Sequence, residues 1–344
     1  MAHNIAMIDG KAAVVTGSGV KPWHKLGETV EGCMTTVEAI QKANLDWDTP
    51  LVPVLYQLPD SDELNKFGDV NNDGKFIGKR VVLNGATGMP LGVVGAQFEP
   101  NPNRQCFQFF DNVLESGAAK IDTAGALGNG ETVWIQALLE GGEFEVIPGD
   151  VVERRLLLKT GHTGNSNTLA LFTGNRVVCS NTLNAALKGR DKKNQIQIRH
   201  SGDVTAKMKT AANLLKKAGI FFDEVKGAFK FLASHQVKQK VLTEYFIDVI
   251  GKTGEKLDQL HGRSRNQITD FQNAHDGSAG GANAIRGTLW GAYNAVTYTT
   301  AHTWTNRKST KYGKREAAKQ FFEGGARVKE RAFSQAIELA NSLN

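Results

Sequence analysis

Residues 133–147 read VWIQALLEGGEFEVI, and this stretch decides the predicted fold class. An apolar run from Val133 to Leu139 reaches two glycines, and the run Phe144–Ile147 follows them. This pattern is typical of two strands, and Glu140–Glu143 would form the tight connection between them. Further short apolar or aromatic runs bounded by Gly and Pro predict strands at 81–83, 91–94 and 106–110.

The β-rich pattern extends on both sides of this stretch and covers residues 76–180. Arg154–Lys159 and Leu169–Thr173 predict a strand pair joined by the loop 162–167, and Asp111–Ala119 predicts one short helix packed on the sheet. The fold class predicted is α+β, with an antiparallel β-rich sheet core at about 76–180 followed by a helical C-terminal region.

After residue 180 the apolar period becomes helical. The pattern predicts a short helix at 181–187, a long one that starts near Ser201 and stops at Gly219, then helices at 221–232, 236–250, 288–305 and 314–343. Residues 251–282 are polar and Gly-rich and predict a loop. The expected organisation is an N-terminal segment (1–75), a β-rich core domain (76–200) and a helical region (201–344) with a Gly-rich linker near 275–282.

The N-terminal segment carries two local signals. Thr35-Thr36-Val37-Glu38 has the pattern of a capping box, with Thr35 or Thr36 as the cap of a helix. Asn71-Asn72-Asp73-Gly74 predicts a turn between two strand-like segments.

Charge is distributed unevenly along the 344 residues. Residues 1–150 hold 10 basic and 20 acidic side chains, whereas residues 151–344 hold 31 basic and 15 acidic ones. A surface with that excess of cations is suited to a polyanion, although acidic and basic patches of neighbouring subunits could instead pair with each other. No apolar run approaches the length of a membrane span, no secretory signal is recognised, and the three cysteines form no CxxC pair. A cytoplasmic location in a bacterial host cell is expected.

Catalytic and metal-binding patterns are weak. Cys179 with His162 or His200 could form a nucleophile and base, but Cys179 follows Arg176-Val177-Val178 within a predicted strand, where a free cysteine favours a core position. His275-Asp276 is an isolated pair, and there is no GxxxxGK[ST] loop. The carboxylates of Asp111, Glu115 and Asp122 would form a catalytic cluster only if the fold brought them together. We therefore expect no enzymatic activity, no metal and no cofactor.

Basic side chains form two clusters along the sequence, and each cluster also contains polar or aromatic side chains that could contact nucleic acid. Residues 151–200 hold nine cations and two anions, together with several Asn and Thr that could bond phosphate and sugar. The second cluster surrounds Trp304 and Tyr312, which could stack on bases or pack in the core. The candidate nucleic-acid-binding residues are Arg154, Arg155, Lys159, Arg176, Lys188, Arg190, Lys192, Lys193, Arg199, Arg307, Lys308, Lys311, Lys314 and Arg315.

Several motifs resemble a known family. They are Trp23–Gly27, Ile121–Leu127 followed by Val133-Trp134, Gly149-Asp150, Arg176–Leu183, Arg199-His200 and Trp290–Val296. Over residues 20–335 the chain resembles the phage/plasmid-related family that carries domain of unknown function 932. The resemblance implies a mobile-element setting but supplies no catalytic residues. The order of a β-rich sheet followed by helices is also similar to that of strand-annealing proteins, an analogy of fold alone.

Together, these features predict a non-enzymatic protein that binds single-stranded DNA and promotes strand annealing in recombination, as a homo-oligomer. The alternative is an anti-defence module of a mobile element, with a host protein as its partner. No membrane partner is expected.

Overall fold

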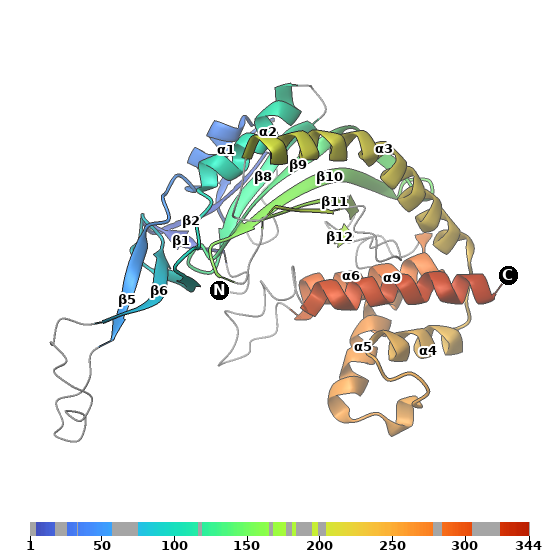
Figure 1. Ribbon diagram of the computed structural model, residues 1–344. Helices are drawn as coiled ribbons and strands as arrows, with labels where there is room; N and C mark the ends of the chain where they lie inside the picture. Colours follow the sequence, from blue (N-terminus) through green and yellow to red (C-terminus); the bar gives the residue numbers. More distant parts are fainter. Residues whose placement is uncertain are drawn as a thin grey trace, which may run out of the picture.

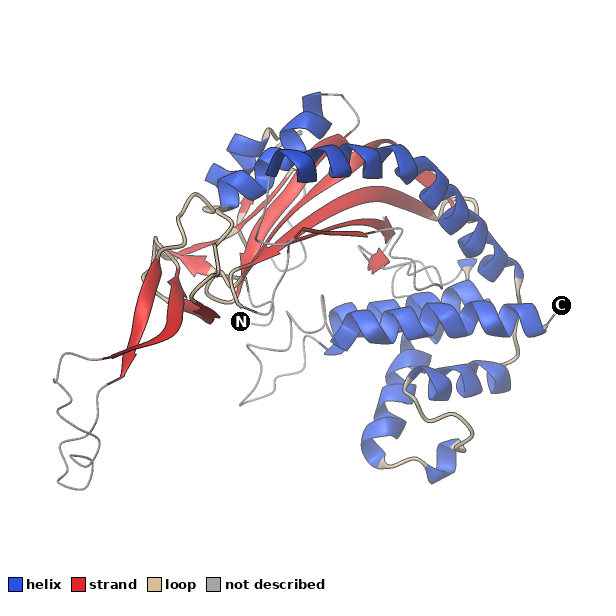
Figure 2. Cartoon of the chain, in the orientation of Figure 1, coloured by secondary structure: helices blue, strands red, loops and turns tan. Residues whose placement is uncertain are grey.

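The computed structural model describes residues 5–17, 26–32, 34–56, 75–115, 119–164, 168–176, 181–183, 195–198, 204–277, 284–304 and 324–343. Its main feature is a curved sheet with helices on its outer side and a second group of helices facing its inner side (Figures 1 and 2). The described residues confirm the α+β prediction, with the helical region following the sheet.

Within the described ranges the main sheet has eight strands, in the order β12-β11-β10-β9-β8-β3-β4, with β13 also pairing with β11. Its central pairs are antiparallel, and Lys159 of β10 lies between Trp134 of β9 and Leu169 of β11. The predicted pairing of 154–159 with 169–173 is therefore confirmed. The strands are β3 (Val14–Thr16), β4 (Glu28–Thr29), β8 (Ala119–Leu127), β9 (Thr132–Glu145), β10 (Val151–Gly161), β11 (Thr168–Arg176), β12 (Asn181–Leu183) and β13 (Gln195–Ile198).

The predicted hairpin at Glu140–Glu143 is wrong, because β9 continues through both glycines. The register shifts there: Leu138 pairs with Arg155, but Glu143 pairs with Glu153. Gly141 has a φ of 62°, which glycine adopts without strain. The glycines thus form a bulge in a long strand. The chain reverses instead at 146–150, where the backbone N–H of Val146 donates to the carbonyl oxygen of Asp150.

Three helices cover the outer, convex face: α1 (Thr36–Lys42), α2 (Asn103–Glu115) and α3 (Val204–Ser234). Thr35 caps α1, and the predicted capping box with Glu38 is confirmed. The strand predicted at 106–110 is wrong, since these residues lie in α2. Cys106 and Phe107 are both buried although adjacent. One face of a helix can bury neighbouring residues, whereas a strand turns them to opposite faces.

Helix α3 passes through Gly219, so the predicted stop at that residue is wrong. Ala218 before it and Phe221, Phe222 and Val225 after it are all buried, so the apolar face continues across the glycine. A glycine costs a helix interior about 1 kcal/mol relative to alanine. Burying one aromatic side chain contributes about 2 kcal/mol or more, which outweighs that cost.

The remaining helices form a layer on the inner side of the sheet (Figure 1). They are α4 (Gln239–Val249), the 3-10 turn η3 (Leu257–Gln259), α5 (Gly262–Asp276), α6 (Leu289–Tyr298), the π-helical turn η5 (Thr299–Thr303) and α9 (Gly324–Ser342). The predictions for 236–250 and 288–305 are confirmed, while the loop predicted at 251–282 is wrong over α5. The helix predicted at 181–187 is wrong over Asn181–Leu183, which forms β12 and pairs with the end of β11, and its remaining residues lie outside the described ranges. For the helix expected at 314–343, only the part from residue 324 lies within the described residues.

A separate three-stranded antiparallel sheet, β5-β6-β7, projects to one side (Figure 1). It consists of β5 (Leu51–Tyr56), β6 (Lys75–Leu83) and β7 (Pro90–Gly95), and a short pair, β1 (Met7–Ile8) with β2 (Lys11–Ala12), lies near its base. The turn predicted at 71–74 lies outside the described residues. A Cβ on Gly92 would lie 3.0 Å from the Cα of Thr163, so β7 packs closely on the loop after β10.

One continuous hydrophobic cluster joins the sheet to both helical groups, from Ala6 to Ala340. At its centre the ring of Phe229 in α3 packs against Phe144 of β9, Trp290 of α6 and Phe333 of α9, with centroid separations of 6.2, 4.4 and 5.9 Å. The indole Nε1 of Trp290 donates to a carboxylate oxygen of Asp150 at 2.7 Å. Among the described residues, no helix is long and apolar enough to cross a membrane.

Candidate functional site

The concave face of the main sheet, opposite α2 and α3, carries the most informative group of side chains. In β9, Val133, Ile135 and Ala137 are buried toward the helices, whereas Trp134 and Gln136 point the other way and are half-buried. The strand alternation of side chains places Lys159, the direct partner of Trp134, on the same face. Trp134, Gln136 and Lys159 therefore form one contiguous surface, which we call the concave-face site.

The indole of Trp134 lies over a glycine of the neighbouring strand. Gly125 of β8 pairs with Trp134, and a Cβ at Gly125 would lie 2.9 Å from Cζ2 of that indole. The missing side chain lets the ring lie close to the strand backbone. An aromatic ring held in this way and still partly exposed can stack on another flat group.

A buried ion cluster lies farther along the same face, around Arg155, whose cross-strand partner in β9 is Leu138. The guanidinium of Arg155 donates from Nε and Nη2 to one carboxylate oxygen of Glu153, at 2.9 and 2.6 Å, and from Nη1 to Asp122. Nη1 also lies 3.4 Å from Oε1 of Gln136. The Arg155 side chain is only 10% exposed, so its charge is neutralised within the chain.

Asp122 reaches Arg155 because β8 is irregular at this point. The register of β8 against β9 shifts between Ile121 and Thr123, which leaves Asp122 as the extra residue of a bulge. Burial raises the pKa of the Asp122 carboxyl to about 6, although the charge of Arg155 acts in the opposite direction. Its Oδ1 atom is buried and makes no hydrogen bond in the described structure.

The structure separates the three predicted basic residues of β10. Arg154 lies on the opposite face from Arg155 and Lys159, with its guanidinium carbon 5.7 Å from the ring centre of Phe144 and 5.6 Å from that of Phe222. It therefore packs between the sheet and α3, as a cation–π partner. Lys159 lies on the concave face, as Arg155 does, and is half-buried.

The other predicted residues are not brought together by the described structure. Arg176 is the last residue of β11, and nothing is described of its side chain. The rest lie outside the described residues: Lys188, Arg190, Lys192, Lys193, Arg199, Arg307, Lys308, Lys311, Lys314 and Arg315. Trp304 donates from Nε1 to Asp270 at 2.9 Å and packs on Phe271, so it belongs to the helical layer.

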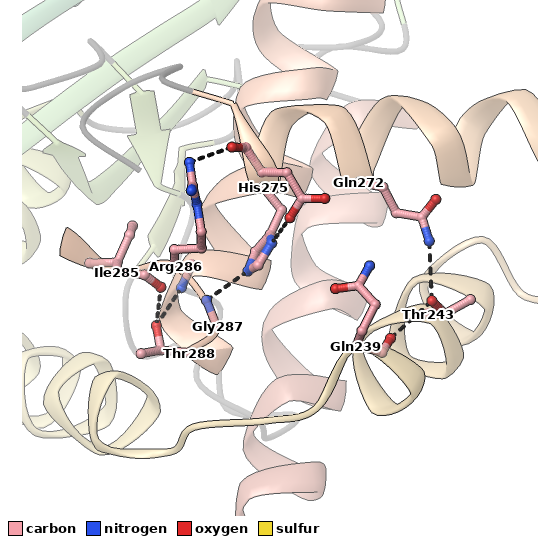
Figure 3. Close-up of polar contacts among 10 residues, drawn as sticks. Gln239, Thr243, Gln272, His275, Ile285, Arg286, Gly287 and Thr288 are labelled. Carbon is pink, nitrogen blue, oxygen red and sulfur yellow. Dashed lines mark hydrogen bonds and ion pairs between the residues drawn. The ribbon is translucent and has the colours of Figure 1, made fainter. Parts of the chain in front are cut away.

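The histidines considered for chemistry have structural roles where they are described. Figure 3 shows His275 at the end of α5, where its Nε2 accepts from the backbone N–H of Gly287 at 3.2 Å and its Nδ1 lies 2.8 Å from Asp276. Because Nε2 accepts, the proton lies on Nδ1 and is donated to Asp276, so both nitrogens are engaged. His162 is fully buried beside Asn103, at 3.0 Å, and Cys179 and His200 lie outside the described residues. Within the described ranges, no three His, Cys, Asp or Glu side chains gather as metal ligands.

Trp134 was not among the predicted site residues, because residues 133–139 form an apolar run in which only Gln136 is polar, and the alternation of burial is visible only in the structure. The signal that the sequence does offer is the two-residue period of a strand, which places Trp134 and Gln136 on one face. Applied to β10 as well, it places Lys159 with Arg155 and excludes Arg154.

A family model described as a domain of unknown function (DUF932) matches residues 90–322, about two thirds of the chain. The chain belongs to this family. The family resemblance seen in the sequence is confirmed at that level. All residues of the concave-face site fall inside the DUF932 match, whereas β5 and β6 precede it. Neither the curated proteins nor the solved structures include a match to this chain.

Proposed function

We propose that this DUF932 protein binds single-stranded DNA along the concave face of its main sheet and promotes annealing of complementary strands. The observation that carries the proposal is the cross-strand pair of Trp134 and Lys159. Single-strand-binding surfaces combine aromatic rings, which stack on bases, with cations that neutralise the backbone. Here Trp134, whose indole is partly exposed, and Lys159, which is half-buried, are direct cross-strand partners.

The charge distribution supports the same proposal at longer range. Residues 151–344, which supply half of the main sheet and the helices facing its concave side, carry a net charge of +16. Such an excess attracts a polyanion and releases its counterions on binding. Because annealing requires bases that remain accessible, most contacts would go to the phosphates, and Trp134 would hold few bases at a time.

The proposed setting is the cytoplasm of a bacterial host, in the recombination of phage or plasmid DNA. The motifs quoted above for the family resemblance support this setting. The protein would act without metal or cofactor, through binding alone. The anti-defence alternative needs a host protein as partner, and capture of such a protein in the absence of DNA would favour it.

The experiment is a titration of labelled single-stranded oligonucleotide at several salt concentrations. We expect the logarithm of the binding constant to fall linearly with the logarithm of salt, by about 0.7 for each phosphate neutralised. Lys159→Gln should lower that slope by about 0.7, and Lys192→Glu with Lys193→Glu should weaken binding to all sequences alike.

The matched control is Lys226→Gln on α3, which is also half-buried but lies on the helix that covers the opposite face. It should leave the slope unchanged. A slope near zero for the unaltered protein would remove the phosphate-contact model. Faster annealing of complementary strands by the protein than by salt alone would support the second half of the proposal, and no acceleration would remove it.

A further inference from the structure

Gln136 occupies the middle of the concave-face site, between the indole and the ion cluster. It lies between Trp134 and Leu138 along β9, and Leu138 is the cross-strand partner of Arg155. Gln136 is half-buried on the same face as the indole. Because a strand rises about 3.3 Å per residue, the Cα atoms of Gln136 and Trp134 are about 7 Å apart. The amide is thus the next side-chain group along the strand from the ring.

The neighbouring guanidinium sets the orientation of this amide. Nη1 of Arg155 donates to Oε1 of Gln136 at 3.4 Å. In a flipped amide the NH2 group would face a guanidinium that carries only donors, so neither group could accept from the other. The amide oxygen therefore faces Arg155, and the amide nitrogen, with its two N–H donors, faces away from it.

The amide nitrogen of Gln136 is accessible to a ligand. Within the described residues it makes no hydrogen bond, and it is not one of the buried polar atoms that lack a partner, so solvent reaches it. The ion cluster depends little on this side chain, because Arg155 has its close partners in the carboxylates of Glu153 and Asp122. Its contact with Gln136 is longer than the usual N–H···O distance of about 2.7–3.2 Å. Gln136 thus presents donors on the concave face without being needed to neutralise Arg155.

A base stacked on Trp134 would bring its edge close to this donor. Thymine and guanine carry a carbonyl oxygen at the position where cytosine and adenine carry an amino group. A fixed N–H group can donate to that carbonyl oxygen, whereas it meets another donor in the amino group. The ring alone would not make this distinction, because every base offers a flat face for stacking.

We propose that Gln136 recognises the base that stacks on Trp134, donating from its amide to the carbonyl oxygen of thymine or guanine and so favouring these bases over cytosine and adenine. The inference rests on the proposed function, since it requires a single strand on the concave face. It adds a base preference that stacking and phosphate contacts do not supply, because both accept any sequence.

The test compares the binding of labelled thymidine and cytidine oligonucleotides of equal length to the full-length protein at one salt concentration. Both carry the same backbone charge, so the ratio of their binding constants cancels the phosphate contacts. The unaltered protein should bind the thymidine oligonucleotide about three- to tenfold more tightly, the usual effect of one hydrogen bond. Gln136→Met keeps the length of the side chain without its amide and should bring the ratio close to unity. Gln136→Glu replaces the donor by an acceptor and should favour the cytidine oligonucleotide.

The matched control is Gln267→Met on α5, since Gln267 is also half-buried but belongs to the helical layer. It should leave the ratio unchanged, and thermal unfolding measures whether each variant is folded. Equal binding of both oligonucleotides by the unaltered protein, or a thymidine preference that survives in Gln136→Met, would overturn this inference and leave the proposed function standing. If neither oligonucleotide binds, the proposed function fails and this inference fails with it.

Discussion

The eight-stranded and the three-stranded sheet each pack one face into the same hydrophobic core, but the faces they leave partly exposed differ in chemistry. The concave face of the larger sheet presents an indole, an amide, an ammonium group and a neutralised ion cluster. The outward face of the smaller sheet presents a row of valines, Val52, Val81 and Val93. Rings and cations suit a polyanion, and aliphatic side chains suit another protein surface, so the two faces differ in the chemistry that they offer to a partner.

The largest expected effect is a loss of stability when the ion cluster on the concave face of the larger sheet is removed. Arg155→Ala would leave Asp122 and Glu153 buried without their counter-charge, so we expect a loss of about 3–5 kcal/mol in the free energy of unfolding. Denaturant-induced unfolding measures it. Arg104→Ala is the control, because Arg104 forms an ion pair with Asp46 while its side chain is 70% exposed, and exposed pairs of this kind contribute little to stability. Equal losses of unfolding free energy in the two variants would show that the buried cluster stabilises the fold no more than an exposed ion pair does.

The next largest effect is expected on single-strand binding, which we assign to the larger sheet and not to the smaller one. Trp134→Ala should weaken single-strand binding by about 1–3 kcal/mol, the usual contribution of one stacked base. Binding titrations of Trp134→Ala beside Val93→Lys measure the contrast, since Val93 is 60% exposed on the smaller sheet and Val93→Lys should retain the binding affinity of the intact protein. Trp134→Phe keeps a flat ring and should recover most of the affinity. If the alanine variant binds as well as the original, the indole has no stacking role.

The smallest expected effect concerns the pH dependence of Asp122. Burial raises the pKa of its carboxyl from 3.8 to about 6, so the folded state holds this proton more tightly than the unfolded state. The stability contributed by protonation is fully present below about pH 4 and is lost as the pH rises through about 6. The free energy of unfolding of the intact protein, relative to Asp122→Asn, should therefore be higher at about pH 5 than at about pH 7, by about 1–2 kcal/mol.

Unfolding curves of the two proteins across that range measure this difference. A constant difference would mean that the pKa of Asp122 is not shifted by the fold. Asp122→Asn keeps the size of the side chain, so the comparison isolates its titration from its packing.

Sequence patterns predicted the parts of the fold that local signals determine. The capping box is of this kind, because Thr35 and Glu38 lie within four residues of each other. The pairing of β10 with β11 is another case, because one short connection joins these consecutive strands. Helix α5 was missed because its composition is polar. Yet Ile268, Phe271 and His275 are all buried, at the spacing of one helical face.

The errors in the sequence predictions arise where tertiary contacts override a local preference. Gly219 would end an isolated helix, and the glycines at 141–142 would favour a turn, but packing of α3 on the sheet and pairing with β10 prevail. For the site, a count of basic residues placed Arg154, Arg155 and Lys159 in one cluster. The two-residue period of a strand separates Arg154 from the other two, but only the side-chain contacts show that Arg154 packs on α3 and that Arg155 is paired with carboxylates.

The aromatic cluster around Phe229 has a consequence for how the chain is made. Its members come from β9, α3, α6 and α9, so Phe144 is synthesised almost two hundred residues before Phe333. While a ribosome is still translating the intervening segment, the rings of Phe229 and Trp290 lack their last neighbour. A nascent chain of this kind exposes apolar surface late into its own translation, and the protein is thus expected to depend on chaperones until the final helix emerges.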